Sequence, residues 1–505
     1  MLSLGVRNFS HGRICFSASS KLIHGSKNKI PSPKELKNFL DEYIVGQNDG
    51  KKVCSVAVYN HYLRVNDKQK KLEVRLQGKL LEEQQKKVDS TSPIEFTSTE
   101  AEQGMRNLQR QLSLELDKDD EDLELSKSNL MVVGPSGSGK TLLATTLARM
   151  LDVPIAITDC TQLTQAGYIG EDVEVCIERL LINADYDVAK AEKGIIVLDE
   201  VDKLAKPAAS IGTKDVSGEG VQQSLLKILE GHGVELTLKR PVNKKKDDKN
   251  NQTAAKKEET FVVDTSNILF MLMGAFVGLD KHIVKRIERI KNPDATANDK
   301  ESDSKKLRFS NTIEHIDIGD GKTVSALNFV TPSDLVSYGI IPELIGRVPI
   351  VTALEPLKQT DLFHILKEPR NALLHQYEYI FKQFGVTLGV TEKALKRVAQ
   401  FALKEGTGAR GLRGIMERLL LNVNYECPDS GISYVLVNEE TVKALQHKEH
   451  SLSTKVKAKY YSRGEQDQFV IDVYKEDEQL GKEFDKRFGR VGTLEKKGKS
   501  YKMEN

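Results

Sequence analysis

The segment Gly134-Pro-Ser-Gly-Ser-Gly-Lys-Thr141 constrains the fold of this chain more than any other part of the sequence. It follows an apolar run at 129–133 and precedes a helical pattern that places Leu143, Leu147 and Leu151 on one face. A glycine-rich loop between a strand and a helix lets backbone N–H groups close around phosphate oxygens. The sequence therefore predicts an α/β domain with a parallel sheet that binds a nucleoside triphosphate.

Every residue of this loop is a candidate nucleotide-binding residue: Gly134, Pro135, Ser136, Gly137, Ser138, Gly139, Lys140 and Thr141. The Lys140 ammonium is placed to neutralise the β- and γ-phosphates, and the Thr141 hydroxyl is placed to hold Mg²⁺. ATP and Mg²⁺ are therefore the expected cofactors.

A second apolar strand at 194–198 ends in two adjacent acids, Asp199 and Glu200, about 60 residues after the loop. In a phosphate-loop enzyme, a carboxylate at this position lies beside Mg²⁺, and its neighbour orients and deprotonates the attacking water. We therefore expect Asp199 to help hold the metal and Glu200 to act as the base. The pair predicts a hydrolase rather than a passive nucleotide binder.

The composition excludes several classes of protein. The chain has 505 residues with 39% hydrophobic and 29% charged residues, yet the charges nearly cancel to +2. It has no global field that would attract nucleic acid or an anionic membrane. The apolar run at 268–279 is too short to cross a bilayer, so no membrane insertion is expected. Five scattered cysteines support neither a disulfide framework nor a zinc module.

The amino-terminal 34 residues are basic and rich in serine, and the first acidic residue is Glu35. This composition is typical of a mitochondrial presequence, although a disordered basic tail would look similar.

We expect the chain to be organised in four regions with three charged insertions. The regions are a presequence or disordered segment at 1–31, a large ATPase domain at 32–350, a small helical domain at 351–450 and a charged C-terminal extension at 451–505. The insertions lie at about 66–128, 239–259 and 291–328. No fold can be assigned to the extension from its sequence.

Glycines frame Tyr168 and Ile169 in the segment 165–172. This pattern indicates a mobile loop with an exposed apolar tip, which is costly to leave in water without a purpose. The alternative is a turn in which Tyr168 packs into the core.

Six motifs occur in a fixed order, and together they resemble the ClpX family of AAA+ protein unfoldases, specifically its mitochondrial members. They are the phosphate loop, Gly167-Tyr-Ile-Gly-Glu-Asp172, the strand ending in Asp199-Glu200, Asp215-Val-Ser-Gly-Glu-Gly-Val-Gln-Gln223, Gly339-Ile-Ile-Pro-Glu-Leu-Ile-Gly-Arg347 and Gly408-Ala-Arg-Gly-Leu-Arg413. The resemblance extends from about residue 33 to 445. It implies a large AAA+ domain followed by a small, mainly helical subdomain.

The resemblance also implies roles for further residues. The turn at 43–47 looks like the family's adenine contact, which makes Ile44 and Val45 nucleotide-binding residues. Arg347 resembles the finger that reaches the ATP of a neighbouring subunit, and Arg410 resembles the sensor arginine of the small domain. A finger that acts between subunits requires an oligomer, and the family forms homohexameric rings.

In the same family, the residues that match Tyr168 and Ile169 line a central channel and grip a polypeptide. Movement of the small domain against the large one then pulls the chain. The segment 206–215 resembles a second channel loop. These likenesses imply an unfoldase in the mitochondrial matrix that acts on unfolded or partly folded matrix proteins. For mitochondrial relatives these clients include 5-aminolevulinate synthase of haem biosynthesis.

The sequence departs from the family pattern in three places. It has no four-cysteine zinc domain, and a lysine-rich insertion at 239–257 replaces the short Arg-Lys-His loop at the channel entrance. Between Gly278 and Gly339 it also lacks the Ile-Gly-Phe tripeptide that docks on the ClpP peptidase. Because that tripeptide is the central anchor of the interface, we expect an unfoldase that works without ClpP. The sequence leaves the polar sensor residue at the end of the strand 269–274 unassigned.

A motor that acts on nucleic acid is the main alternative, and the lysine-rich insertion is the only candidate surface for it. Tyr168 and Ile169 disfavour this alternative because they offer nothing to a phosphate, so no nucleic-acid partner is expected.

Overall fold

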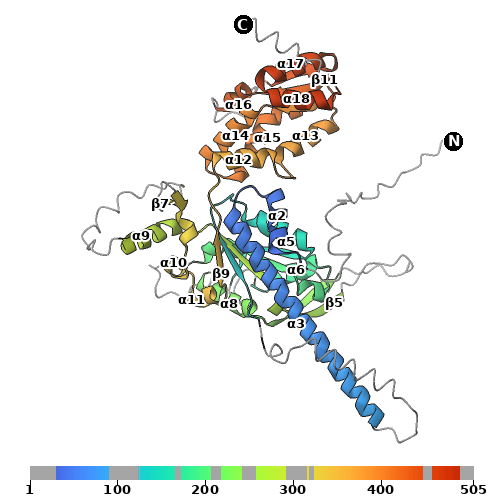
Figure 1. Ribbon diagram of the computed structural model, residues 1–505, viewed down its shortest axis with the longest axis vertical. Helices are drawn as coiled ribbons and strands as arrows, with labels where there is room; N and C mark the ends of the chain where they lie inside the picture. Colours follow the sequence, from blue (N-terminus) through green and yellow to red (C-terminus); the bar gives the residue numbers. More distant parts are fainter. Residues whose placement is uncertain are drawn as a thin grey trace, which may run out of the picture.

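Five short apolar runs form a parallel sheet at the centre of the computed structural model (Figure 1). The strand order is β2-β3-β6-β1-β9, with bounds β1 Leu130–Val133, β2 Ile155–Asp159, β3 Ile195–Asp199, β6 Leu269–Gly274 and β9 Ile350–Ala353. Strands β1, β3 and β6 are buried almost throughout because they lie inside the sheet and are covered on both faces. The α/β fold with a parallel sheet is therefore confirmed.

The structure describes residues 30–89, 123, 125–164, 172–205, 218–240, 257–291, 315–317, 323–446 and 458–489. Within these ranges, no helix combines the length and the apolar character that crossing a membrane would require.

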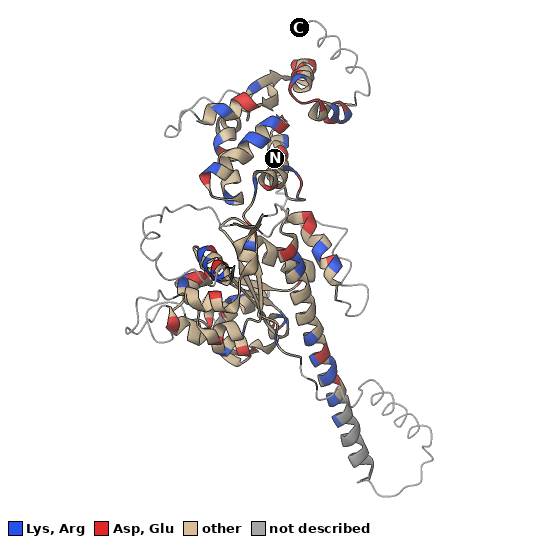
Figure 2. Cartoon of the chain, turned by 60° about the vertical axis from the view of Figure 1, so that its left-hand side comes forward, with Lys and Arg blue, Asp and Glu red and all other residues tan. Residues whose placement is uncertain are grey.

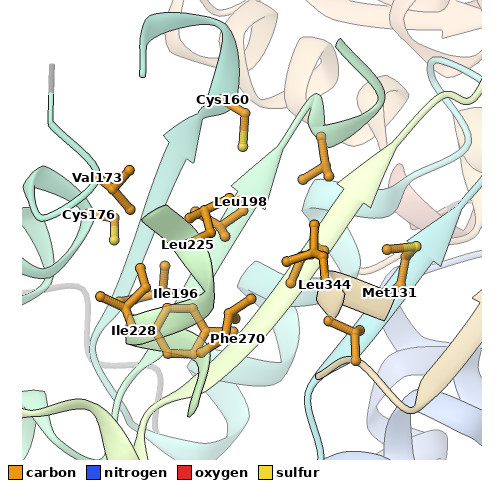
Figure 3. Packing of buried hydrophobic residues seen from close by; sticks show 14 of the residues in the cluster. Met131, Cys160, Val173, Cys176, Ile196, Leu198, Leu225, Ile228, Phe270 and Leu344 are labelled. Carbon is orange, nitrogen blue, oxygen red and sulfur yellow. The ribbon is translucent and has the colours of Figure 1, made fainter. Parts of the chain in front are cut away.

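Helices cover both faces of the sheet. Their bounds are α2 Pro33–Tyr43, α3 Asn48–Asp89, α5 Lys140–Leu151, α6 Val175–Asn183, α7 Val188–Ala191, α8 Glu219–Glu230, α9 Leu279–Lys291, α10 Pro332–Tyr338 and α11 Pro342–Gly346. One core packs Ile196, Leu198 and Phe270 of the sheet against Leu225 and Leu344 of the helices (Figure 3). A second core, on the other face, joins α2, α3 and α5 to the sheet.

Two antiparallel hairpins complete the large domain. Strands β4 Gly233–Arg240 and β5 Lys257–Asp264 pair along their whole length, and β7 His315–Asp317 pairs with β8 Thr323–Ser325. The lysine-rich sequence between β4 and β5 lies outside the described residues, apart from the strand ends.

Helix α3 runs without interruption through the start of the insertion expected at 66–128, and its second half projects from the domain (Figure 1). Its first half is anchored by buried residues such as Val58 and Val65, whereas Leu72 and Leu76 are more than half exposed. The projecting half carries charges of both signs (Figure 2). Lysine, glutamate and glutamine favour helix, and i,i+4 contacts such as Lys71 with Asp67 add support.

The small domain is mainly helical, as expected, and is built on a three-stranded sheet. Its helices are α12 Gln359–Lys367, α13 Leu373–Gln383, α14 Glu392–Glu405, α15 Ala409–Glu426, α16 Glu439–Gln446, α17 Gln466–Glu476 and α18 Glu478–Arg487. Its strands are β10 Thr387–Val390, β11 Ile432–Val437 and β12 Lys459–Ser462. Strand β11 pairs parallel with β10 and antiparallel with β12.

The structure differs from the sequence analysis at both ends of this domain. Strand β9 crosses the boundary expected at 350/351, so the linker between the domains follows Ala353. Much of the charged extension expected at 451–505 is folded into the small domain, because β12 completes its sheet and α17 and α18 pack on it. Phe469 and Phe484 are fully buried there among other aromatic rings.

Candidate active site

The phosphate loop leaves the carboxyl end of β1 and leads directly into α5. Gly137 and Gly139 have φ of 76° and 99°, which a residue with a side chain rarely adopts. Gly139 is the N-cap of the twelve-residue helix α5 and offers no side-chain cap, so the first N–H groups of the helix face the loop. The loop therefore presents a concentration of backbone donors, as its sequence predicts.

Lys140 is the buried cation of the loop. Its Nζ donates to the carbonyl oxygens of Gly134 at 2.7 Å and Pro135 at 2.9 Å. Burial lowers the pKa of Lys140, while the carboxylates of Asp199 and Asp202 act in the opposite direction. Positive charge is thus held where phosphate oxygens would arrive.

The two expected Mg²⁺ ligands meet across neighbouring elements. Thr141 Oγ1 at the start of α5 donates to Asp199 Oδ2 at the end of β3, at 3.1 Å. The next residue, Glu200, is exposed and has a left-handed backbone with φ of 58°. This conformation is strained for a side-chain-bearing residue and turns the chain sharply after the strand.

Asp202 is a further acid of the site that the sequence analysis did not single out. Its carboxylate is buried, accepts a hydrogen bond from the backbone N–H of Ala275 at 3.1 Å and lies 3.4 Å from Lys203 Nζ. A Cβ on Gly274 would approach Asp202 Oδ1 to 2.8 Å. The end of β6, where no polar sensor residue could be assigned, is thus occupied by Asp202 from the neighbouring element. The only sign of Asp202 in the sequence is that it follows Asp199 by three residues and so lies close to the carboxyl end of β3.

The small domain reaches the phosphate loop directly. The N–H of Ala409, at the start of α15, donates to the carbonyl of Gly137 at 3.2 Å. A Cβ on Gly137 would lie 2.6 Å from the carbonyl oxygen of Thr407, so the two backbones fit only because glycine stands there. Arg410 follows on α15, is exposed and is close enough to Lys140 to lower its pKa.

The turn between α2 and α3 is tied to the linker between the domains. Ile44 is buried and Val45 is half-buried in this turn. The Gln47 side chain donates from Nε2 to the carbonyl of Glu355 and accepts from its N–H at Oε1, both at 2.8 Å. The Gln47 amide therefore makes with the Glu355 backbone the same pair of hydrogen bonds that a neighbouring strand would make.

Arg347 is not brought to this site within one chain. Its backbone carbonyl accepts a hydrogen bond at 2.9 Å from Asn129, which precedes β1, whereas Gly134 follows β1. The strand between them separates the two by about 16 Å at 3.3 Å per residue. The Arg347 guanidinium, half exposed, pairs with Glu230 of α8 at 2.5 Å. Tyr168 and Ile169 lie outside the described residues.

These observations agree with a bound nucleotide and Mg²⁺. The Ser138 hydroxyl is buried in the loop and has no hydrogen-bond partner among the residues that the structure describes. A free donor, a buried lysine and glycines in left-handed conformations form a cradle for phosphate, and Thr141 with Asp199 supplies the oxygen ligands that Mg²⁺ prefers.

Comparison with known proteins decides the family. Residues 125–351 match the model of the AAA domain (Cdc48 subfamily), and residues 357–428 match the C-terminal, D2-small domain of ClpB protein. The chain is 67% identical over 492 residues to the ATP-dependent clpX-like chaperone, mitochondrial, of Saccharomyces cerevisiae, covering 96% of this chain and 95% of that protein. The chain belongs to the ClpX family.

A bacterial member of the ClpX family is also similar. The ATP-dependent Clp protease ATP-binding subunit ClpX of Treponema denticola is 40% identical over 415 residues, which cover 82% of this chain and 81% of that protein. Membership of the ClpX family makes the chain an AAA+ ATPase and an ATP-dependent chaperone. The predicted fold, an AAA+ large domain followed by a small helical domain, is confirmed.

Proposed function

We propose that the chain is an ATP-driven protein unfoldase that threads client polypeptides through a homohexameric ring in the mitochondrial matrix. Membership of the ClpX family and the mitochondrial relative support this proposal. The observation that carries the ring is the position of Arg347, whose backbone lies at the amino end of β1, whereas its own phosphate loop follows the carboxyl end of that strand. This distance from its own phosphate loop supports a role for Arg347 at the ATP of a neighbouring subunit.

In this proposal the chain's residues divide the work. Lys140 and the loop N–H groups bind the phosphates, while Thr141 and Asp199 hold Mg²⁺. Bound Mg·ATP supplies the phosphoanhydride bond that is hydrolysed. Glu200 orients the attacking water and takes its proton.

Two arginines stabilise the charge that develops on the transferred phosphate. Arg410 acts from the small domain of the same chain, and Arg347 acts from the adjacent subunit. In related systems a finger supplied by a partner is worth about 10³–10⁵ in rate.

The proposal also covers how force reaches a client. The direct hydrogen bond between Ala409 and Gly137 joins the small domain to the loop that holds the phosphates. A change at the phosphates therefore tilts the small domain against the large one, and this relative movement shifts the channel loop of the large domain that carries Tyr168 and Ile169. Because native domains are stable by only about 5–15 kcal/mol, repeated pulls suffice to unfold them.

The enzymatic part is tested with the Glu200→Gln variant. We expect it to bind ATP normally and to lose at least about 100-fold in turnover, because a positioned base contributes about 10²–10⁴. A variant that hydrolyses ATP at the wild-type rate would remove Glu200 from the mechanism. Turnover stimulated by DNA and indifferent to unfolded protein would favour the nucleic-acid motor instead.

We further propose that the chain remodels clients without a ClpP peptidase and that 5-aminolevulinate synthase is among them. The missing Ile-Gly-Phe tripeptide supports the first point, and analogy with mitochondrial relatives supports the second. Glu200→Gln expressed in mitochondria should trap clients, which mass spectrometry identifies. Degradation of a client by a stable ATP-dependent complex with ClpP would contradict the first point, and a trap that holds no matrix protein would contradict the location.

A further inference from the structure

Gln222 belongs to the motif at 215–223 and has no role in the function proposed above. It lies in the first turns of α8, and its side chain is 0% exposed. A buried amide needs partners for both its donors and its acceptor. The partners of Gln222 lie on two separate segments: one follows Glu200, and the other leads to Arg347.

On one side is the segment that carries the hydrolytic acid. Gln222 Nε2 donates at 2.8 Å to the carbonyl of Leu204. Leu204 ends the 3₁₀ helix η2 Val201–Leu204, which begins immediately after Glu200. The amide therefore contacts the end of the turn that places Glu200 at the edge of the sheet.

On the other side is the segment that carries the finger. Gln222 Oε1 accepts from the N–H of Ile341 at 2.9 Å, and Nε2 also approaches the carbonyl of Gly339 at 3.4 Å. Ile341 is the N-cap of α11, and Arg347 is its C-cap. One side chain thus connects the turn after Glu200 to the start of the five-residue helix that Arg347 follows.

The same helix α8 also holds the far end of α11. Its last residue, Glu230, pairs with the Arg347 guanidinium at 2.5 Å. Asn129 donates from one Nδ2 to the carbonyls of both Leu229 and Arg347, at 3.4 and 2.9 Å. Helix α8 is therefore joined to the finger segment at both ends, and Gln222 is the buried connection at the first end.

We propose that Gln222 is a positioning residue that fixes the segment bearing Arg347 against the segment bearing Glu200. This inference rests on the proposed function, in which Arg347 serves a neighbouring subunit. In each subunit, the position of the Arg347 finger offered to the neighbour then depends on the position of the turn that carries its own Glu200. The amide links two adjacent ATP sites of the ring through a single side chain.

The two sides are not equally well anchored without Gln222. Strand β3 pairs with both β2 and β6, and Asp202 of η2 is bonded to Ala275. Helix α11 has only five residues and pairs with no described strand; Leu344 and Ile345 hold its middle in the core, but its first turn is fixed by the bonds to Gln222. Loss of the amide should therefore displace the finger segment and leave the subunit's own carboxylates in place.

The variant Gln222→Met keeps the length of the side chain and removes its hydrogen bonds. We expect kcat to fall about ten- to hundredfold with little change in the KM for ATP, because a displacement of about 1 Å can cost 10²-fold. Gln223→Met is the matched control, because Gln223 is the adjacent residue and is exposed. It should keep wild-type turnover.

Mixed rings identify which site is damaged. Glu200→Gln subunits do not hydrolyse ATP but still lend an intact finger. When Gln222→Met and Glu200→Gln subunits are coexpressed at increasing proportions of the latter, turnover for each Gln222→Met subunit should rise. A subunit whose own site is damaged would gain nothing from a better neighbour.

Arg347→Ala subunits mixed with Glu200→Gln subunits test the proposed function separately. If this mixture gains no turnover, the finger does not act between subunits, and the proposed arrangement fails. If it gains turnover while Gln222→Met is either unimpaired or not rescued, only the inference about Gln222 is overturned.

A second variant covers the case in which Gln222→Met does not fold. Ile341→Pro deletes the N–H that donates a hydrogen bond to Gln222 Oε1. Proline can adopt the backbone conformation of Ile341, which has φ of −67° and ψ of 140°. It should show the same fall in kcat and the same rescue by Glu200→Gln subunits. Wild-type turnover of Ile341→Pro would overturn the inference.

Discussion

His61 gives a prediction whose size follows almost entirely from its burial. It lies on the inner face of α3 and is 0% exposed. Burial lowers the pKa of His61 to about 3, and the positive charges of Arg64 and Lys127 act in the same direction, while the backbone of Asn267 opposes them. The folded protein therefore keeps His61 neutral at any pH that a cell experiences.

The unfolded chain behaves differently, because there the histidine titrates near its ordinary pKa of about 6.5. Between pH 6.5 and 3 the unfolded state binds a proton that the folded state does not, so stability falls as the pH falls. At pH 5.5 the proton stabilises the unfolded chain by RT ln 11, about 1.4 kcal/mol, and at pH 7.5 by less than about 0.1 kcal/mol. The difference in stability between pH 7.5 and 5.5 does not depend on the pKa of His61 in the folded protein, provided that this pKa lies well below 5.5.

The substitution His61→Leu should remove this loss. We expect the wild type to lose about 1.4 kcal/mol more than His61→Leu between pH 7.5 and 5.5. Urea unfolding at the two pH values measures it, with pulsed hydrogen exchange of peptides from β1 and β6 reporting the large domain alone. His375→Leu, at an exposed histidine of the small domain, is the control. An equal loss in the wild type and His61→Leu would refute the reasoning.

Three further predictions concern other parts of the molecule. Lys127 lies over the Phe270 ring at 4.7 Å, and burial lowers its pKa to about 7. The unfolded chain therefore binds more protons between pH 7 and 10.5, and stability should rise by about 2 kcal/mol from pH 7 to 9 in urea titrations of the wild type but not of Lys127→Met. Phe469→Ala should destabilise the small domain by about 3–5 kcal/mol, measured by its thermal transition, because the ring is fully buried against other aromatics. Gly137→Ala should bind ATP about tenfold more weakly than Gly139→Ala in a fluorescent-nucleotide titration, a difference of about 1.4 kcal/mol. Both glycines have positive φ, but only at Gly137 would a Cβ meet the small domain. Equal affinities would remove the interdomain contact as the cause.

The sequence predicts those parts of the site that depend on local pattern. A strand, a glycine-rich loop and a helix follow one another directly, so the environment of Lys140 is encoded within about twenty residues. The meeting of Thr141 with Asp199 also follows from the sequence, because parallel strands end at the same edge of the sheet.

Contacts between distant segments were beyond such reasoning. Gln47 and Glu355 are 308 positions apart, and nothing in either segment signals that an amide side chain will pair with the linker. Asp202 and Gln222 lie within or beside motifs that were identified, but their partners are backbone groups, which leave no mark on the sequence.

Two helices, α3 and α17, lie in charge-rich segments that the sequence analysis interpreted as an insertion and a tail. The long helix α3 continues past Val65 because its polar residues are good helix formers, although the change in composition indicated an insertion. In α17 the buried residues Phe469, Val470 and Val473 lie on one face, but the many charges around them indicated a tail. Composition averaged over a window hid helix-forming residues in α3 and a narrow apolar stripe in α17.

Strand β12 has a consequence for the order in which the protein can be assembled. The small-domain sheet takes its third strand from 459–462, and the aromatic cluster behind it needs residues as far as Phe484. Chains fold from the amino-terminal end as they are made or delivered, so the large domain is ready long before these residues arrive. The small domain, which meets Gly137 through Thr407 and Ala409, is therefore completed last. Until those residues arrive, the chain would hold a finished phosphate loop beside an incomplete small domain, and full hydrolysis would wait for nearly the whole polypeptide.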